Sequence, residues 1–423
     1  MHIGYKGKRI VFVSKTPCEP PQGINLLVCK DLNVQPATII NDYEIWDNQV
    51  FKKSSPKPFT KLKVALVGVY KIQCGISTYA EQMFPRIKAR VAEAHIFAEK
   101  AEVPEEEGVT RCWKRGEPLT ELINKIHAFS PDVVYLEHEF GIFPNAGYWL
   151  SFCTQMQSYR LIVKQHSVFY HKDKMICEAA VPEIIVHSNI GKKVLQEKGV
   201  PSKIYVIPHG CFPCKDLSRN WNMYHSDHTI MQFGFGFHYK GWENAIRAVG
   251  LLKKNKYPKI FYTGLFSESS FNKNFHGQYY EQLMKLVSEL GLMDQIAIIR
   301  GYQSDASLDS YFRTNQIAVF PYTANGVHTV YGVTGAARLA MGTGTPTIVS
   351  SVAQFDDLEG ICPRISSVEE LAFEIEKFFL NPALKKEQVE RQNKYLVENS
   401  WDNVVEKHLR IFSGDLDTNL SSI

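Results

Sequence analysis

The chain has 423 residues, of which 44% are hydrophobic and 22% are charged, and its formal net charge is +4. This composition is typical of a soluble globular protein, and the length predicts more than one domain. No window approaches the ~18 uncharged apolar residues of a transmembrane helix, and the apolar run near the N-terminus is too short for a signal peptide. We therefore expect a cytoplasmic protein with no transmembrane segment.

The distribution of charged residues and cysteines indicates which partners and which metal or disulfide sites to expect. Residues 1–71 carry eleven Lys and Arg against five acidic residues, so this part has a balance of +6 and the rest has −2. A basic N-terminal part is compatible with an acidic acceptor or a membrane surface, although a solvated face is the commoner explanation. The nine cysteines lie mostly in apolar runs, which favours reduced thiols. Cys211 and Cys214 have no second ligand pair at metal-binding spacing, so we expect no zinc site.

Residues 1–60 alternate short apolar runs with Pro-rich turns. The pattern predicts two or three strands and little helix, with strands at 10–13, 24–28 and 38–40. A Lys-, Ser- and Pro-rich stretch at 52–59 has the composition of a linker. We interpret 1–60 as a β-rich N-terminal extension.

Strands and helices alternate from residue 61 to residue 215. The predicted strands lie at 63–69, 94–98, 133–136, 161–163, 183–186 and 203–207. The first predicted helix begins at Ser77, a candidate N-cap. Further helices are predicted at 118–129, 146–157 and 190–197. This order predicts a parallel, doubly wound sheet.

A second α/β series follows a connector at 211–228. Its predicted strands lie at 229–233, 259–263, 295–299, 317–320 and 347–350, and its helices at 242–253, 279–289, 307–313, 334–341 and 369–380. We predict an α/β protein with two tandem doubly wound Rossmann-like domains, 61–215 and 216–398, with a cleft between them. A last helix in the segment 399–423 is expected to pack back on the first domain.

Histidines follow four successive strands of the first series: His138, His166, His187 and His209. In parallel sheets, ligands bind outside the carboxyl ends of the strands. A single histidine at such a point is usually structural. Four at successive strand ends indicate one rim of a binding cleft.

The stretch 231–251 predicts an anion site at the start of the second series. A buried strand turns through Gly234 and Gly236 into a helix that opens at Lys240 and Gly241. Backbone N–H groups and the helix dipole favour an anion there, and the lysine adds a full positive charge. Glycines and a lysine are also compatible with a plain strand–turn–helix connection.

The motifs together resemble those of GT-B glycosyltransferases, close to the family 4 group of retaining enzymes. The resemblance covers roughly residues 61–412 and rests on segments such as PDVVYLEHEFGIFPNAG, EIIVHSNIGKKVL, FGFGFHYKGWENAIRAV and VTGAARLAMGTGTPTIVSS. It implies a GT-B fold and transfer of a sugar from a UDP- or GDP-linked donor, with retention, to a polar acceptor such as a glycan or glycolipid. It also implies that no metal is needed.

The resemblance assigns donor contacts in both halves of the cleft. Lys240 matches the phosphate-binding lysine, and Thr334 with Gly335 matches a helix start whose N–H groups bind the diphosphate. Tyr302 follows a strand in the segment that holds the nucleotide base. Gly75 matches a glycine loop that approaches the donor phosphate.

The acceptor side of the resemblance is carried by histidines. His166 matches a strand-end histidine near the sugar and the acceptor. His138 and Glu139 lie beside it in sequence and are candidates to orient the acceptor hydroxyl or take its proton, although Glu139 is equally compatible with a plain loop carboxylate. In such enzymes the departing phosphate oxygen is thought to accept the acceptor proton, so the resemblance requires no carboxylate nucleophile.

The chain also departs from the family pattern. Many relatives carry an arginine where this chain has Phe235, and Arg338 or Arg300 is then the candidate second cation. Many relatives also have two glutamates at positions that fall near Tyr331 and Leu339 here. Their absence puts the usual donor-sugar contacts in doubt.

Three functional hypotheses remain open from the sequence. The first is an active retaining transferase. The second is a transferase that acts on modified nucleic-acid bases, suggested only by the basic residues 1–71, which would predict strongly salt-dependent DNA binding. The third is a catalytically degenerate GT-B module that binds a nucleotide or a glycan without turnover.

Overall fold

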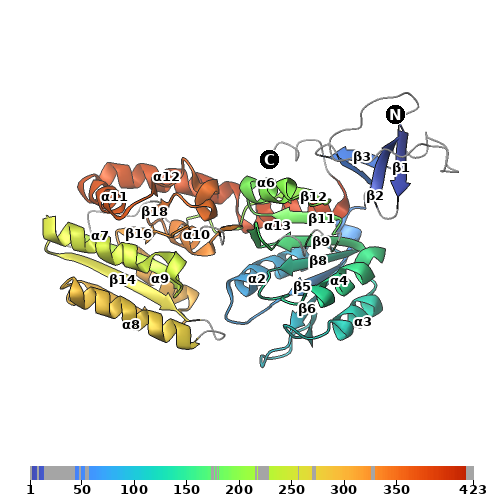
Figure 1. Ribbon diagram of the computed structural model, residues 1–423, viewed down its shortest axis with the longest axis horizontal. Coiled ribbons are helices and arrows are strands. Elements are labelled where there is room, and N and C mark those ends of the chain that lie inside the picture. Colours follow the sequence, from blue (N-terminus) through green and yellow to red (C-terminus); the bar gives the residue numbers. More distant parts are fainter. Residues whose placement is uncertain are drawn as a thin grey trace.

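A computed structural model gives the arrangement of the chain. It describes residues 2–6, 9–13, 43–46, 49–52, 57–172, 176, 179, 181–214, 217, 228–255, 257–268, 273–324 and 329–415. Two α/β units lie side by side, each with a parallel sheet, and the N-terminal hairpins lie beside the first unit (Figure 1). Among these residues, no helix is both long enough and apolar enough to cross a membrane.

The first sheet has seven parallel strands in the order β12-β11-β9-β8-β5-β6-β7. In chain order these are β5 (Lys63–Gly68), β6 (Glu93–Glu99), β7 (Val109–Trp113), β8 (Val133–His138), β9 (Arg160–Gln165), β11 (Glu183–Val186) and β12 (Lys203–Val206). The connecting helices are α2 (Gly75–Lys88), α3 (Thr120–Phe129), α4 (Ala146–Gln155) and α6 (Asn189–Glu197).

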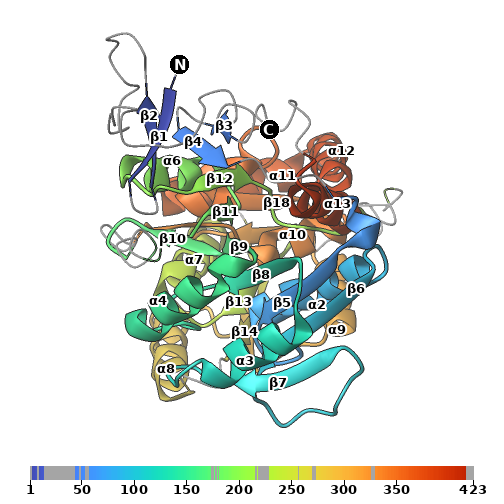
Figure 2. The same ribbon diagram turned by 90° about the vertical axis from the view of Figure 1, so that its right-hand side faces the viewer.

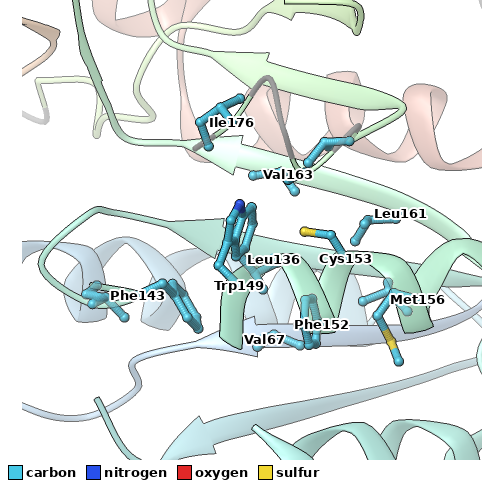
Figure 3. Packing of buried hydrophobic residues seen from close by; sticks show 14 of the residues in the cluster. Val67, Leu136, Phe143, Trp149, Phe152, Cys153, Met156, Leu161, Val163 and Ile176 are labelled. Carbon is cyan, nitrogen blue, oxygen red and sulfur yellow. The ribbon is translucent and has the colours of Figure 1, made fainter. Parts of the chain in front are cut away.

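Two apolar layers cover the two faces of this sheet. Figure 3 shows one of them, in which Trp149 and Phe152 of α4 pack over Val67, Leu136 and Val163. The other layer contains α13 (Trp401–Ser413), whose buried stripe includes Trp401, Val404 and Leu409. The last helix of the described residues therefore packs on the first sheet.

The second sheet has six parallel strands in the order β15-β14-β13-β16-β18-β19. They are β13 (His228–Phe235), β14 (Ile260–Ser267), β15 (Ile296–Arg300), β16 (Ile317–Phe320), β18 (Thr347–Ser350) and β19 (Arg364–Ile365). The helices are α7 (Trp242–Asn255), α8 (Lys273–Glu289), α9 (Asp305–Thr314), α10 (Gly335–Gly342), α11 (Val368–Leu380) and α12 (Pro382–Glu398).

In Figure 2 the first unit lies in front of the second, and short segments tie the two units together. Strand β10 (Ser167–Phe169) of the first unit pairs antiparallel with β17 (Val330–Gly332) of the second. Cys211 forms a β-bridge with Ser400, and its thiol lies 3.0 Å from the carbonyl oxygen of Asn399. The rims of both sheets are thus held facing each other.

The predicted fold class is confirmed. The N-terminal strand at 10–13 corresponds to β2 (Arg9–Val13), which pairs with β1 (His2–Lys6), and a second hairpin joins β3 (Tyr43–Trp46) to β4 (Gln49–Lys52). The predicted strands at 24–28 and 38–40 lie outside the described residues. The predicted N-cap Ser77 is wrong, because α2 begins at Gly75 after Cys74, and the Ser77 hydroxyl instead accepts from the N–H of Ile72.

Candidate active site

The loop that follows β13 packs tightly against its neighbours. Gly241 has φ +68°, and a Cβ there would overlap the carbonyl oxygen of Pro321, so the position needs glycine. A Cβ on Gly236 would overlap the ring of Phe266. Gly234 is still part of β13 and lies against the stem of Lys240. Close packing therefore accounts for Gly236 and Gly241, and a donor contact for Gly234 or Gly236 stays a prediction.

A chain of polar groups links Lys240 to the start of α10. Lys240 ends a short 3-10 turn, η4 (His238–Lys240), and its Nζ donates to the Tyr322 hydroxyl at 2.8 Å. The Tyr322 oxygen lies 3.1 Å from Thr334 Oγ1. Burial lowers the pKa of Lys240 and raises the pKa of Tyr322. Because an ammonium can only donate, the Tyr322 oxygen accepts a hydrogen bond from Lys240. The Tyr322 hydroxyl can in turn donate a hydrogen bond to Thr334 Oγ1.

The start of α10 offers donors to a ligand. Thr334 precedes the helix, and its side chain accepts no hydrogen bond from the first turn. The first N–H groups of a helix have no partner within it and carry the positive end of the helix dipole. The Thr334 hydroxyl and the N–H groups that begin at Gly335 can therefore donate to one anion.

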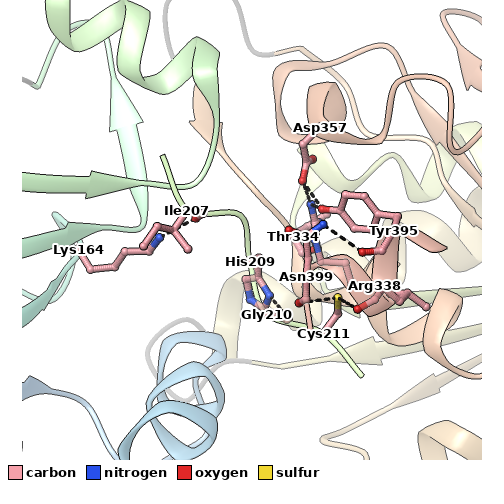
Figure 4. Close-up of polar contacts among 11 residues, drawn as sticks. Lys164, Ile207, His209, Gly210, Cys211, Thr334, Arg338, Asp357, Tyr395 and Asn399 are labelled. Atoms are coloured by element: carbon pink, nitrogen blue, oxygen red, sulfur yellow. Dashed lines mark hydrogen bonds and ion pairs between the residues drawn. The ribbon is translucent and has the colours of Figure 1, made fainter. Parts of the chain in front are cut away.

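Arg338 supports α10 from inside the protein (Figure 4). Its side chain is 1% exposed and forms an ion pair with Asp357, and it donates to the carbonyl oxygen of Thr334 at 2.8 Å and to the Tyr395 hydroxyl at 3.1 Å. Burial opposes the charge, but Asp357 and Tyr395 outweigh it and raise the pKa of Arg338. The expectation that Arg338 replaces the missing arginine in the cleft is not supported, because its guanidinium is committed to these partners. Arg300 pairs with Glu268 at 2.6 Å.

Three histidines converge on one tyrosine at the rim of the first sheet. The ring centre of Tyr79 lies 4.9 Å from that of His166, 5.6 Å from His187 and 5.2 Å from His209. We call His166, His187 and His209 the rim histidines. His166 Nδ1 lies 3.3 Å from His187 Nε2, and His166 Nε2 lies 4.0 Å from Glu137 Oε2. The strand ends that carry the rim histidines therefore lie together, as the sequence predicts.

His138 lies apart from the rim histidines. It is the last residue of β8, and its ring is fully buried among Phe140, Phe143 and Trp149. Burial lowers its pKa to about 3, and its ring nitrogens have no hydrogen-bond partner among the described residues. The predicted contact with an acceptor is incompatible with this orientation, because the side chain points into the core.

Glu139 and Gly75 occupy the ends of two strand–helix connections. The Glu139 carboxylate accepts from the N–H of Gly141 and so stabilises the turn after β8. Apart from its chain neighbours and its own helix backbone, no described atom lies within 4 Å of a Cβ built on Gly75, so this position faces open space. Roles for Glu139 in proton transfer and for Gly75 in donor binding stay predictions.

An open cavity of about 520 Å³ lies between the two units. The first unit contributes Lys71, Gln73 and Glu81, and the second contributes Tyr302. Tyr302 is 50% exposed and follows β15. Its ring therefore borders a space shared by both units, where the sequence predicted the nucleotide base.

Apolar packing occupies the positions where many relatives carry acidic residues. Tyr331 lies in β17 opposite Val168 and packs on the core of the first unit. Leu339 lies on α10 and packs on the core of the second unit. Tyr322 was missed in the sequence, because a tyrosine after a strand is as typical of a core as of a site.

Solved structures match the chain in fold. No family model and no curated protein sequence matches it. A glycosyltransferase from Rickettsia africae matches at 13% identity over 85% of this chain and 100% of its own, with a TM-score of 0.64. A sucrose-phosphate synthase from Thermosynechococcus elongatus matches at 14% identity over 83% and 98%, with a TM-score of 0.63. Anabaena HepE in complex with UDP matches at 12% identity over 83% and 100%, with a TM-score of 0.63. The resemblance inferred from the motifs is thus confirmed at the level of the fold, and the chain has the GT-B fold of glycosyltransferases.

Proposed function

We propose that the protein is a retaining glycosyltransferase that moves a sugar from a UDP- or GDP-linked donor to a polar acceptor. The observation that carries the proposal is the chain from Lys240 through Tyr322 to Thr334. It joins a cation, a hydroxyl and the start of a helix within the second unit of a GT-B fold. Relatives whose structures contain UDP or a UDP-sugar analogue support the class of donor.

In the proposed reaction, negative charge develops on the leaving diphosphate, and the site must stabilise that charge. The bond between the anomeric carbon and the donor phosphate oxygen breaks, and the electron pair stays on the diphosphate. Lys240, the Thr334 hydroxyl and the first N–H groups of α10 stabilise that charge. The acceptor oxygen bonds to the anomeric carbon on the same face, and its proton passes to the departing phosphate oxygen. We propose that no metal takes part, so EDTA should leave turnover unchanged.

One feature favours a second candidate, a GT-B module that binds a nucleotide or a glycan without turnover. The chain has Phe235, Tyr331 and Leu339 where many relatives have one arginine and two glutamates, and two of these are packed in apolar cores. Such a module would keep the phosphate contacts and lose the contacts with the reacting sugar.

A thermal-shift and hydrolysis screen separates the candidates. The protein is incubated with UDP-, GDP-, ADP- and TDP-sugars, because a ligand that binds only the folded state raises the melting temperature. A shift with one donor and slow sugar release supports the transferase, and the Lys240→Ala variant should then lose about 10²–10³-fold in turnover. A shift without release for any acceptor offered supports the binding module. No shift with any nucleotide contradicts the transferase and a nucleotide-binding module.

A further inference from the structure

The rim histidines differ in where their ring nitrogens point. His166 directs Nδ1 to His187 and buries Nε2 beside Glu137, and His187 buries its remaining Nδ1. Neither ring presents a nitrogen to the cleft. Burial, followed by the nearby Lys164, lowers the pKa of both rings, so they are neutral at ordinary pH.

His209 directs a nitrogen toward the second unit. Its Nδ1 lies 2.6 Å from the carbonyl oxygen of Gly210. A carbonyl oxygen can only accept, so Nδ1 carries the hydrogen and Nε2 of the neutral ring keeps a lone pair. Nε2 lies 3.4 Å from the point where a Cβ on Gly335 would stand, and no described residue hydrogen-bonds it. Nε2 therefore lies beside the first turn of α10.

The His209 ring is held in one position. Tyr79 and Trp401 contact it edge-on, with ring centres 5.2 and 5.4 Å away, and His187 lies 5.6 Å away. The nearby charged groups are Arg338, Lys164 and Asp357. Burial, with a smaller effect of Arg338, lowers the pKa of His209 to about 3, so Nε2 stays a hydrogen-bond acceptor in neutral buffer. Figure 4 shows the ring on the segment that joins Ile207 to Cys211, close to Thr334 and Arg338.

We propose that His209 contacts the donor sugar, with its Nε2 accepting a hydrogen bond from a sugar hydroxyl while the diphosphate lies against the first turn of α10. An acceptor lone pair repels an ionised phosphate oxygen but takes a hydrogen bond from a hydroxyl. The glycine at 335 has no side chain that would stand against Nε2, so a sugar hydroxyl can reach this nitrogen from beside the first turn of α10. This inference rests on the proposed function, because it needs a nucleotide sugar with its phosphates at α10.

The test compares ligands that differ only by the sugar. Isothermal titration measures the dissociation constants of UDP and UDP-glucose, and of GDP and GDP-mannose, for the wild type, His209→Asn and His209→Gln. Asparagine keeps a donor for the Gly210 carbonyl but has no atom at Nε2, whereas the longer glutamine side chain can place its amide oxygen there. The exposed His127 of α3, changed to Asn, is the matched control.

The expected result is a split between the two ligands of a pair. His209→Asn should bind the nucleotide sugar about 10-fold more weakly, as for one lost hydrogen bond, and the nucleoside diphosphate as the wild type does. His209→Gln should recover part of the loss. Equal loss on both ligands, or no loss on either, overturns the role of His209 and leaves the proposed function intact. A wild type that binds neither pair overturns the proposed function and this contact with it.

Discussion

The two sides of the cleft differ in charge. The side formed by the second unit has two cations, Lys240 and Arg338, near the start of α10. The side formed by the first unit has neutral rim histidines packed around Tyr79. Under the proposed function, the second-unit side binds the phosphates of the donor and the first-unit side binds uncharged hydroxyl groups.

The two cations themselves differ in their partners. Arg338 is paired with Asp357, so its charge is balanced inside the protein. The described partners of Lys240 are the Tyr322 hydroxyl and the rings of Tyr239 and Tyr322, none of which is a carboxylate. Lys240 is therefore the cation suited to a ligand, and Arg338 is suited to holding α10 in place.

The largest expected effect is on stability and concerns Arg338. Arg338→Met leaves the Asp357 carboxylate, which is only 13% exposed, without its counter-ion, and this should lower the free energy of unfolding by about 3–5 kcal/mol. Urea denaturation measures the change. Lys285→Ala is the control, because its ion pair with Glu289 is largely exposed and should contribute at most about 0.5 kcal/mol.

A double variant sharpens that prediction. Arg338→Met with Asp357→Leu removes both charges and should recover part of the lost stability, because no unpaired charge stays buried. If the single variant is as stable as the wild type, Arg338 does not have the structural role assigned to it.

The next effect is a pH dependence of stability from His138. Its folded pKa is about 3, below the ordinary value near 6.5, so between these values the unfolded chain binds a proton that the folded chain does not. Stability from this group is complete above about pH 6.5 and is lost as the pH falls, by about 1.4 kcal/mol per pH unit.

The matching experiment follows the urea midpoint of the wild type and His138→Phe from pH 7.5 to pH 4.5. The phenylalanine variant should lose less stability on acidification, because it has no ring nitrogen to protonate in the unfolded state. His127→Gln, a change on an exposed helix face, should keep the wild-type slope. Identical slopes in all three proteins would show that His138 is already protonated or exposed.

The smallest effect concerns the link between the two donor groups. Tyr322→Phe removes the hydroxyl between Lys240 and Thr334 but keeps the ring, so sugar release should fall by roughly 3- to 10-fold, as for one neutral hydrogen bond. Tyr159→Phe is the control, since it also removes one hydroxyl, which hydrogen-bonds His127 of α3 in the first unit and makes no contact with Lys240. Equal rates for Tyr322→Phe and the wild type would remove Tyr322 from the site.

Hydrophobic periodicity predicted most of the sheet but not α12. The helix at Pro382–Glu398 buries Gln388 and Gln392, which hydrogen-bond the backbone of Thr345 and Thr347. A helix that packs largely through amide side chains lacks a continuous apolar stripe. Hydrophobic periodicity therefore does not predict it. The hydrogen bonds that hold α12 in place depend on the backbone of Thr345 and Thr347, which the sequence pattern around Gln388 and Gln392 does not reveal.

Strand length decided which predicted site residues reach the cleft. The strand predicted from the sequence ends at Leu136, whereas β8 continues through Glu137 and His138. Side chains alternate along a strand, so Glu137 faces the rim histidines and His138 faces the opposite core. Lys240 and Thr334 could be predicted because each stands just before a helix that the sequence pattern predicts, while Tyr322 joins them only in three dimensions.

The most direct test of the division between the two sides is the affinity for UDP, measured by isothermal titration for the wild type, Lys240→Ala and Lys254→Ala. Lys254 is exposed on α7, away from η4, and serves as the control. Our account predicts that Lys240→Ala binds UDP about 10- to 100-fold more weakly, as for a lost charge-assisted hydrogen bond, with no change for Lys254→Ala. Unchanged binding of UDP to Lys240→Ala would contradict the assignment of the phosphates to this side of the cleft.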